Sequence, residues 1–241
     1  MKKPLIAIVA TLTALPAAAQ TVQTFSLPAG CTAYLTIQTE SCSVDHIFTC
    51  EGDAEGTQRR ASIGERGLSG LYQIDEETQW LESIDIFSEE TERLSPDVAD
   101  PASISELVET GIDTYDFTTE SDEVGQSRYV GFDSLTGNTI TVDGILLDET
   151  EYNITAYNAD GEVEWSSKGN EYISQRFNMF LSGSSEVTFG EETFDIEDRP
   201  VEFIFEGEPG FLSANPKYGC GVTESAAPSV IQRLEALTNE L

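Results

Sequence analysis

The sequence predicts an all-β fold: a single-domain antiparallel meander curled into a barrel or half-barrel. Two observations carry this prediction. Apolar and polar residues alternate along most segments after residue 31, as they do in strands with one buried face. Short stretches typical of turns, such as residues 158–161, separate these segments. Successive hairpins of this kind build a meander, and curling hides its edges. A β-sandwich is the alternative architecture.

The first nineteen residues are predicted to be a signal peptide, cleaved after Ala19. Two lysines begin it, residues 5–15 are apolar apart from threonines, and it ends in the small residues that signal peptidase accepts. The apolar run is shorter than the ~20 residues that a membrane-spanning helix needs. Residues 20–241 are therefore expected to form one exported domain, periplasmic or secreted, with no transmembrane segment.

The first hairpin is predicted from two alternating segments, residues 32–38 and 43–49, which turn near residues 40–41. Further strands are expected over residues 68–75, 78–87, 127–133, 139–142, 151–157, 162–167, 176–181, 186–189 and 201–206. This makes about eleven strands in all. Trp80, Ile84 and Ile86 are expected to point inward, and residues 137–138 are expected to form a turn because they read Gly-Asn.

Two segments follow the helical period instead. Asp100 and Pro101 are expected to open a short helix near residues 101–110, which Gly111 closes. A C-terminal amphipathic helix is expected near residues 228–240, where apolar residues recur on one face. The acidic stretch over residues 89–100 is expected to be a surface loop.

Four cysteines in an exported chain predict two disulfides. In the first hairpin the partner of residue n is 81 minus n, so Cys31 faces Cys50. Pairing Cys42 with either of these would join the two ends of one extended arm, roughly 26 Å apart at ~3.3 Å per residue. A disulfide needs Cα atoms within about 7 Å. The predicted pairing is therefore Cys31–Cys50 with Cys42–Cys220.

The charge balance excludes several classes of partner. The chain carries 44 acidic side chains against 12 lysines and arginines, a net charge of -32. It has no basic stripe to neutralise phosphates, so we expect no nucleic-acid binding. The same charge repels the chain from anionic lipid headgroups.

Motifs of catalysis and of cofactor binding are missing from the sequence. His46 is the single histidine, and we interpret it as a strand residue rather than a metal ligand or base. No nucleophile elbow, phosphate loop or dinucleotide fingerprint is found. We therefore expect no catalytic site, no metal and no cofactor. Two glutamate pairs, Glu162 with Glu164 and Glu202 with Glu206, each lie on one face of a predicted strand. We interpret them as part of the solvent-exposed face of the sheet.

Aromatic residues are spread over most of the predicted strands. They predict either core or a cavity for an apolar ligand inside the curved sheet. The set comprises Trp80, Tyr115, Phe117, Tyr129, Phe132, Tyr152, Trp165, Tyr172, Phe177, Phe203, Phe205 and Phe211. The expected function is that of an exported, non-enzymatic β-protein that binds a lipid or other hydrophobic small molecule, or an envelope protein. The alternative is a carboxylate-dependent hydrolase that acts on an envelope or extracellular substrate.

Overall fold

Thirteen strands and one short helix make up residues 23–221, the part of the chain that this computed structural model describes. The predicted signal peptide and the C-terminal helix near residues 228–240 lie outside the described residues. The strands are β1 (Cys31–Thr39), β2 (Val44–Cys50), β3 (Gln58–Gly64), β4 (Gly67–Ile74), β5 (Trp80–Asp85), β6 (Glu90–Leu94), β7 (Ile112–Ser121), β8 (Gly125–Val142), β9 (Ile145–Tyr157), β10 (Val163–Ser174), β11 (Met179–Phe189), β12 (Glu192–Glu197) and β13 (Pro200–Phe205). The helix α1 covers Ile104–Thr110.

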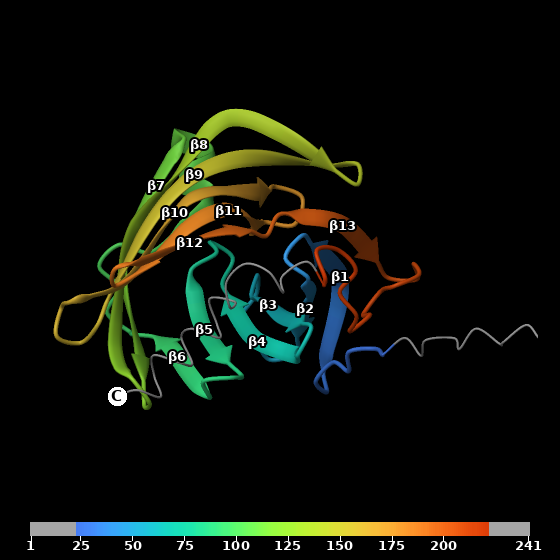
Figure 1. The fold of residues 1–241 in the computed structure, drawn as a ribbon, viewed down its shortest axis with the longest axis horizontal. Coiled ribbons are helices and arrows are strands. Elements are labelled where there is room, and N and C mark those ends of the chain that lie inside the picture. The colour runs from blue at the N-terminus through green and yellow to red at the C-terminus, as the bar shows by residue number, and fades with distance from the viewer. Residues whose placement is uncertain (1–22, 222–241) are drawn as a thin grey trace, which may run out of the picture.

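All thirteen strands belong to one antiparallel sheet. Strands β1 to β12 follow one another as a meander, and β13 returns to pair with β1, so β12 and β13 are its two edges. The sheet is not closed, because no pairing joins β12 to β13 within the described residues. It is strongly curled, with the long strands β7 to β11 arching over the shorter β1 to β5 (Figure 1). The all-β prediction and the meander are confirmed.

The first hairpin has the predicted register at its open end and a different one near its turn. Cys31 pairs with Cys50 and Ala33 with Phe48, as the predicted rule requires. A bulge between Ala33 and Leu35 then shifts the pairing by one residue, so that Leu35 lies opposite Ile47. A bulge of this kind increases the local twist of the strands, which suits a strongly curled sheet.

The predicted turn at residues 137–138 is wrong. Strand β8 runs through it without a break and pairs with β9 on both sides of an irregularity between Leu135 and Thr139. Gly137 supplies a positive φ of 81° there, and the hydroxyl of Thr136 donates to the carboxylate of Glu149 at 3.0 Å. The Gly-Asn pair therefore bends one long strand instead of ending it.

Several other elements differ from the expectation. Strands β3, β7 and β12 were not predicted, and β6 lies inside the segment expected to be a loop. One strand, β11, replaces two predicted ones. Trp80 lies opposite Ile74, on the face of Tyr72, whereas Ile84 lies opposite Leu71. Ile86 is 37% exposed beyond the end of β5, so the expected shared inward face of Trp80, Ile84 and Ile86 is wrong. The short helix is present, but its N-cap is Ser103 rather than Asp100, and its C-cap is Gly111 as predicted.

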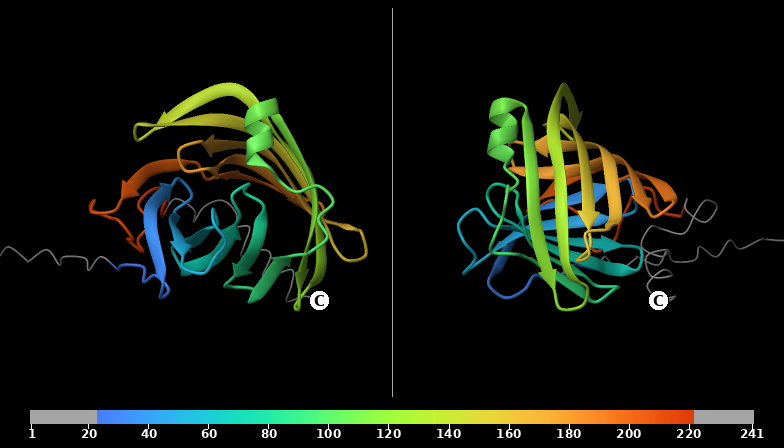
Figure 2. Two further views of the ribbon diagram at one scale, coloured as in Figure 1. Left: turned by 180° about the vertical axis from the view of Figure 1, so that it is seen from behind. Right: turned by 90° about the vertical axis from the view of Figure 1, so that its left-hand side faces the viewer.

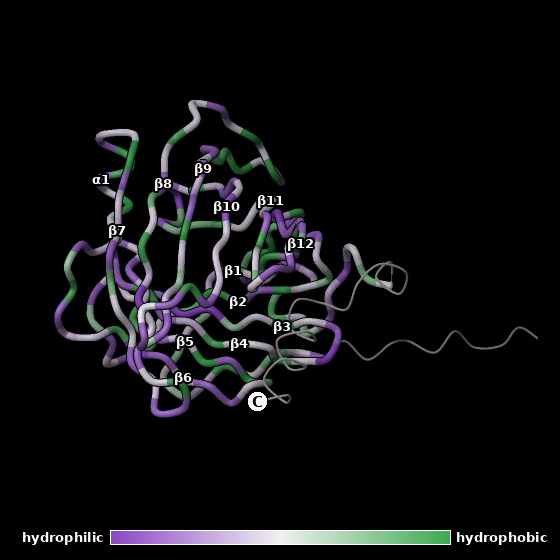
Figure 3. The backbone as a smooth tube through the Cα atoms, turned by 60° about the vertical axis from the view of Figure 1, so that its left-hand side comes forward, coloured by the Kyte–Doolittle hydropathy of each residue, from purple (hydrophilic) through white to green (hydrophobic). Residues whose placement is uncertain are grey.

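Buried side chains are distributed over four clusters rather than one core. In Figure 3 hydrophobic and hydrophilic stretches alternate along the strands, so each face contributes to packing. At the end of β10, Tyr172 packs with Leu35 and Phe203, whereas its neighbour Ile173 packs with Leu107 of α1. Consecutive strand residues point to opposite faces, so this end of β10 is covered on both. Helix α1 stands beside one end of β7 (Figure 2).

The inner, concave face is identified by contacts between strands that lie far apart in the sheet. Arg60 of β3 donates from Nη2 to the carbonyl of Phe180 in β11 at 2.9 Å. Gln58 of the same strand donates to the carbonyls of Phe177 and Asn178 at 3.2 and 2.9 Å. Arg60 pairs with Tyr72, Tyr72 pairs with Ser83, and Ser83 pairs with Glu92 of β6. These four side chains therefore lie on the same face of the sheet.

Replacing Gly131 by alanine tests the close packing of this inner face. A Cβ at Gly131 in β8 would meet the carbonyl oxygen of Asn153 and lie 2.7 Å from the ring of Tyr115. We expect Gly131→Ala to cost about 1–3 kcal/mol of unfolding free energy, as overpacking does. The matched control is Gly64→Ala in β3, where an added Cβ would lie 3.9 Å from the carbonyl oxygen of Cys42. Equal stability of the two variants in urea unfolding would contradict this packing.

Candidate functional site

The four cysteines form the two disulfides Cys31–Cys50 and Cys42–Cys220, the pairing that the hairpin register predicts. The first bond joins directly opposite residues of β1 and β2. The second links the β1–β2 turn to the segment after β13, across a sequence separation of 178 residues. It therefore fixes the end of the described chain to its beginning.

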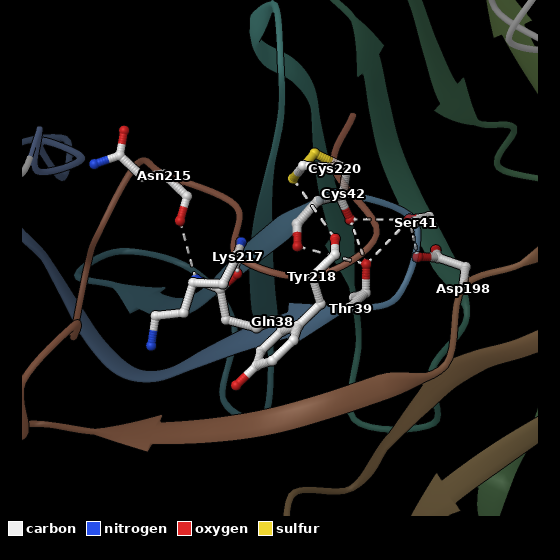
Figure 4. The surroundings of a disulfide bond; sticks show 10 residues. Gln38, Thr39, Ser41, Cys42, Asp198, Asn215, Lys217, Tyr218 and Cys220 are labelled. Carbon is white, nitrogen blue, oxygen red and sulfur yellow. Dashed lines mark hydrogen bonds between the residues drawn. A yellow bond between two sulfur atoms is a disulfide. The ribbon is translucent and has the colours of Figure 1, made fainter. Parts of the chain in front are cut away.

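Buried Gln38 of β1 strengthens this second link (Figure 4). Its Nε2 donates to the carbonyl of Asn215 at 3.2 Å, and its Oε1 accepts from the backbone N–H of Lys217 at 2.9 Å. Gly219 has a positive φ of 71°, and a side chain there would collide with the carbonyl oxygen of Glu40. The disulfide, the glutamine and the glycine together fit the last described segment against the first hairpin.

The inner face of β7 to β10 carries side chains in regular cross-strand rows. Phe117 pairs with Tyr129, Tyr129 with Ala156, and Ala156 with Trp165. We call these four residues the aromatic row. Two rows along, Asp113 lies opposite Asp133. In the next row Thr150 lies directly opposite Glu171. We call Asp113, Asp133, Thr150 and Glu171 the acid patch. It lies roughly 13 Å from the aromatic row, four residues along β8 at ~3.3 Å each.

The aromatic row is closely packed and has three glutamates beside it. The rings of Phe117 and Tyr129 are stacked with centroids 5.2 Å apart, and Trp80 contacts both at 5.5 and 5.3 Å. The hydroxyl of Tyr129 donates to Glu92 at 2.9 Å. Burial, together with the nearby charges of Glu92 and Glu164, raises the pKa of Glu90 to about 7.

The acid patch is the most unusual feature of the inner face, because like charges lie side by side with little solvent. Asp113 and Asp133 are 3% and 7% exposed. Burial, with the charges of Glu171 and Asp113 nearby, raises the pKa of Asp133 to about 8. Burial raises the pKa of Glu171 to about 7, and that of Asp113 to about 6 although the backbone N–H of Ser103 donates to it at 2.9 Å.

A groove of about 290 Å³ lies on the other face, beside the Cys31–Cys50 disulfide. Phe48, Leu71 and Ile84 are its apolar lining. Arg59 stands at its edge, held by two bonds of 2.7 and 2.8 Å to the carboxylate of Asp53. Phe48 and Leu71 belong to the cluster that also includes Phe25, Leu27, Phe211 and Leu212 of the terminal segments. The groove is thus a part of this apolar face that the terminal segments leave uncovered.

The predicted aromatic residues do not gather in one place. Tyr115, Phe117 and Tyr129 belong to the cluster of β7 to β9, Tyr172 and Phe203 to the cluster that joins β10 to β1 and β13, and Phe211 packs on the outer face. His46 is fully buried, with its Nδ1 3.0 Å from the hydroxyl of Thr36, which agrees with a structural strand histidine. The acid patch was not predicted, because its residues come from four strands whose alignment only the pairing reveals.

Comparison of the chain with protein-family models, curated proteins and solved structures finds no match. Residues 23–221 contain no helix of the length and hydrophobicity that crossing a membrane requires. The two disulfides indicate an oxidising, exported environment. In the described part of the chain, three or more metal-binding side chains come together only at Cys42, Glu65 and Cys220, where both cysteines are already bonded to each other.

Removing the two disulfides separately should have unequal effects. The loop closed by Cys42–Cys220 is much longer than the one closed by Cys31–Cys50, with separations of 178 and 19 residues. The chain-entropy relation gives about 5 and about 3 kcal/mol for them. We expect the double variant Cys42→Ser, Cys220→Ser to lose more unfolding free energy in guanidinium than Cys31→Ser, Cys50→Ser. The reverse order would contradict the role assigned to the second bond.

Acidification from pH 8.5 to 6.5 should stabilise the folded protein. The raised pKa values of Asp133, Glu171 and Glu90 mean that the folded state binds protons that the unfolded state releases, so stability rises as pH falls through this window. Each such carboxyl contributes up to about 1.4 kcal/mol per pH unit. The lowered pKa of His46, about 4, opposes this only below its ordinary value of 6.5.

Thermal unfolding at constant ionic strength measures this slope. Asp133→Asn should reduce it, whereas Asp160→Asn, at an exposed turn residue, should leave it unchanged. A melting temperature that falls between pH 8.5 and 6.5 in the wild-type protein would show that the inner carboxyls are ionised when folded.

Proposed function

We propose that this chain is an exported, non-enzymatic β-protein of the periplasm, or a secreted one, that binds an apolar small molecule in the outer groove. The curled sheet then serves as a half-barrel scaffold. The observation that carries the proposal is the groove beside the Cys31–Cys50 disulfide, where half-buried Leu71 and Ile84 lie next to buried Phe48. Sites for small molecules are mostly apolar hollows with a few fixed polar groups at their rims.

The groove has both properties. Its lining combines the apolar side chains of Phe48, Leu71 and Ile84 with charged ones, of which Arg59 is held in place by Asp53. Glu82, another lining residue, forms an ion pair with Arg93 at 2.8 Å. Fixed rim groups reduce the entropy that binding costs. Because Arg59 and Glu82 are each paired with an opposite charge, the apolar lining is the main source of affinity for a ligand.

The size of the groove favours a small molecule over a protein. Its volume, about 290 Å³, is at the lower end of the ~300–1,000 Å³ typical of small-molecule sites. A stable protein interface usually buries ~800 Å² on each partner. Export is supported by the disulfides and by the N-terminal sequence, and the net charge of -32 keeps the molecule soluble.

The alternative, a carboxylate-dependent hydrolase, has weaker support. Glu162 and Glu164 are exposed, and Glu202 is bonded to Lys217 at 2.7 Å. The carboxyls with raised pKa values, Asp113 and Asp133, are 3% and 7% exposed. A bulky glycan needs an open cleft between the two catalytic carboxyls, and carboxyls buried to this degree do not provide one.

Binding of Nile red, an uncharged apolar dye, tests the proposal. We expect saturable binding that Ile84→Gln weakens at least tenfold, because it places an amide in the apolar lining. The matched control is Leu146→Gln, at a 61% exposed residue near the tip of β9, which should change the affinity less than twofold.

Native mass spectrometry of protein purified from its own periplasm identifies the occupant. A bound apolar molecule that Ile84→Gln abolishes is the expected result. A copurified protein in its place, or dye binding that both variants weaken equally, would contradict the proposed site.

A further inference from the structure

Thr150 of β9 is fully buried, and its hydroxyl oxygen has no hydrogen-bond partner within the described residues. Its cross-strand partner on one side is Glu171, and Asp133 lies one row away on the adjacent strand β8. Residues directly opposite have Cβ atoms about 5 Å apart, and diagonal neighbours are about 7–8 Å apart. The hydroxyl therefore lies on the inner face between two carboxyl groups.

These two carboxyls also lack hydrogen-bond donors. Within residues 23–221, neither Asp133 nor Glu171 receives a hydrogen bond, whereas Asp113 accepts one from the backbone of Ser103. Arg60 donates to the carbonyl of Phe180 and lies 3.8 Å from Asp45, and its charge only partly offsets the rise that burial causes in the pKa of Glu171. Unlike the hydroxyl of Thr150, the oxygens of Asp133 and Glu171 are not fully buried atoms and remain accessible to a donor, so this part of the acid patch suits a ligand that donates hydrogen bonds and carries positive charge.

From this geometry we infer that the acid patch binds an aliphatic amine, with one ammonium group placed between Asp133, Thr150 and Glu171. An ammonium group has three N–H donors and no acceptor, which matches the three oxygen-bearing side chains. A positive charge there offsets the repulsion that Glu171 and Asp113 exert on the Asp133 carboxylate. This inference concerns the inner face and is independent of the outer groove.

The spacing of the patch argues against a metal ion as the ligand. A calcium ion holds its oxygen ligands at 2.3–2.6 Å, so those ligands crowd closely around it. Within the described residues, the carboxyl oxygens of Asp113, Asp133 and Glu171 do not come together within 4.8 Å as a metal cluster would. An organic cation is larger, and its methylene groups can lie along the nearby rings of Tyr115 and Tyr152.

Access to the patch is provided at Glu171. This residue is partly exposed, unlike Asp113, Asp133 and Thr150. The net charge of -32 draws cations toward the protein. An amine can therefore approach through Glu171 and lose its water as it reaches Thr150.

Calorimetric titration of the purified protein with 1,4-diaminobutane tests this inference, with uncharged 1,4-butanediol as the ligand control. We expect saturable binding of the diamine and none of the diol. Asp133→Asn and Thr150→Val, which keep the size of their side chains, should each weaken binding at least tenfold. Asp195→Asn removes one exposed carboxylate of β12 and should change it less than twofold. Circular dichroism confirms that each variant is folded.

Three results would overturn the inference. Equal weakening by Asp133→Asn and Asp195→Asn would mean that the diamine is held only by the general acidity of the surface. Unchanged affinity for the diamine in Thr150→Val would show that the Thr150 hydroxyl does not contact the ligand. Binding of calcium chloride that Asp133→Asn abolishes, without binding of the diamine, would assign the patch to a metal ion. None of these results bears on Nile red binding in the outer groove.

Discussion

The cross-strand register of β7 to β10 is the constraint on which the inner face depends. Because the strands pair without a shift from Asp113 to Ser121, the aromatic row and the acid patch are fixed relative to each other. The same register forces Asp113 and Asp133 to lie opposite each other in a poorly solvated place. Burial raises the pKa values of both groups, and the nearby charges of Glu171 and Asp113 raise that of Asp133 further, so the folded protein holds protons there.

The two faces of the sheet consequently have different characters. The inner face combines rings with carboxyls, and side chains such as Arg60 and Gln58 bridge it from β3 to the β11 end. The outer face of β1 to β4 is apolar and is largely covered by the terminal segments, which Cys42–Cys220 and Gln38 hold down. The outer groove lies where the terminal segments do not cover this face. The two ligand sites that we propose, one for an apolar molecule outside and one for an amine inside, rest on this division.

The sequence predicted those features that local contacts determine. The Cys31–Cys50 pairing follows from one hairpin, and the second disulfide follows by elimination. The hairpin over residues 158–161 was also predictable, since Asn158 accepts bonds from Asp160 and Glu162 and Gly161 has a positive φ.

Features that depend on neighbouring strands were not predictable in this way. Alternation could not show that residues 137–138 bend β8 instead of ending it, because that depends on continued pairing with β9. Alternation placed Trp80 and Ile84 on one face, but a bulge between Gln73 and Ile74 puts Trp80 against the inner-face rings and leaves Ile84 in the outer groove. The acid patch needs four strands in one register, and no local pattern in the chain carries that information.

The titration of the Asp133 carboxyl by carbon-13 NMR tests this account most directly, because the protonation of that group reports the burial and repulsion at the centre of the inner face. The assigned carboxyl resonance is followed from pH 3 to 10, with exposed Asp195 as the internal reference. The account predicts a midpoint near 8 for Asp133. A midpoint for Asp133 close to the ordinary aspartate value of about 4 would contradict it.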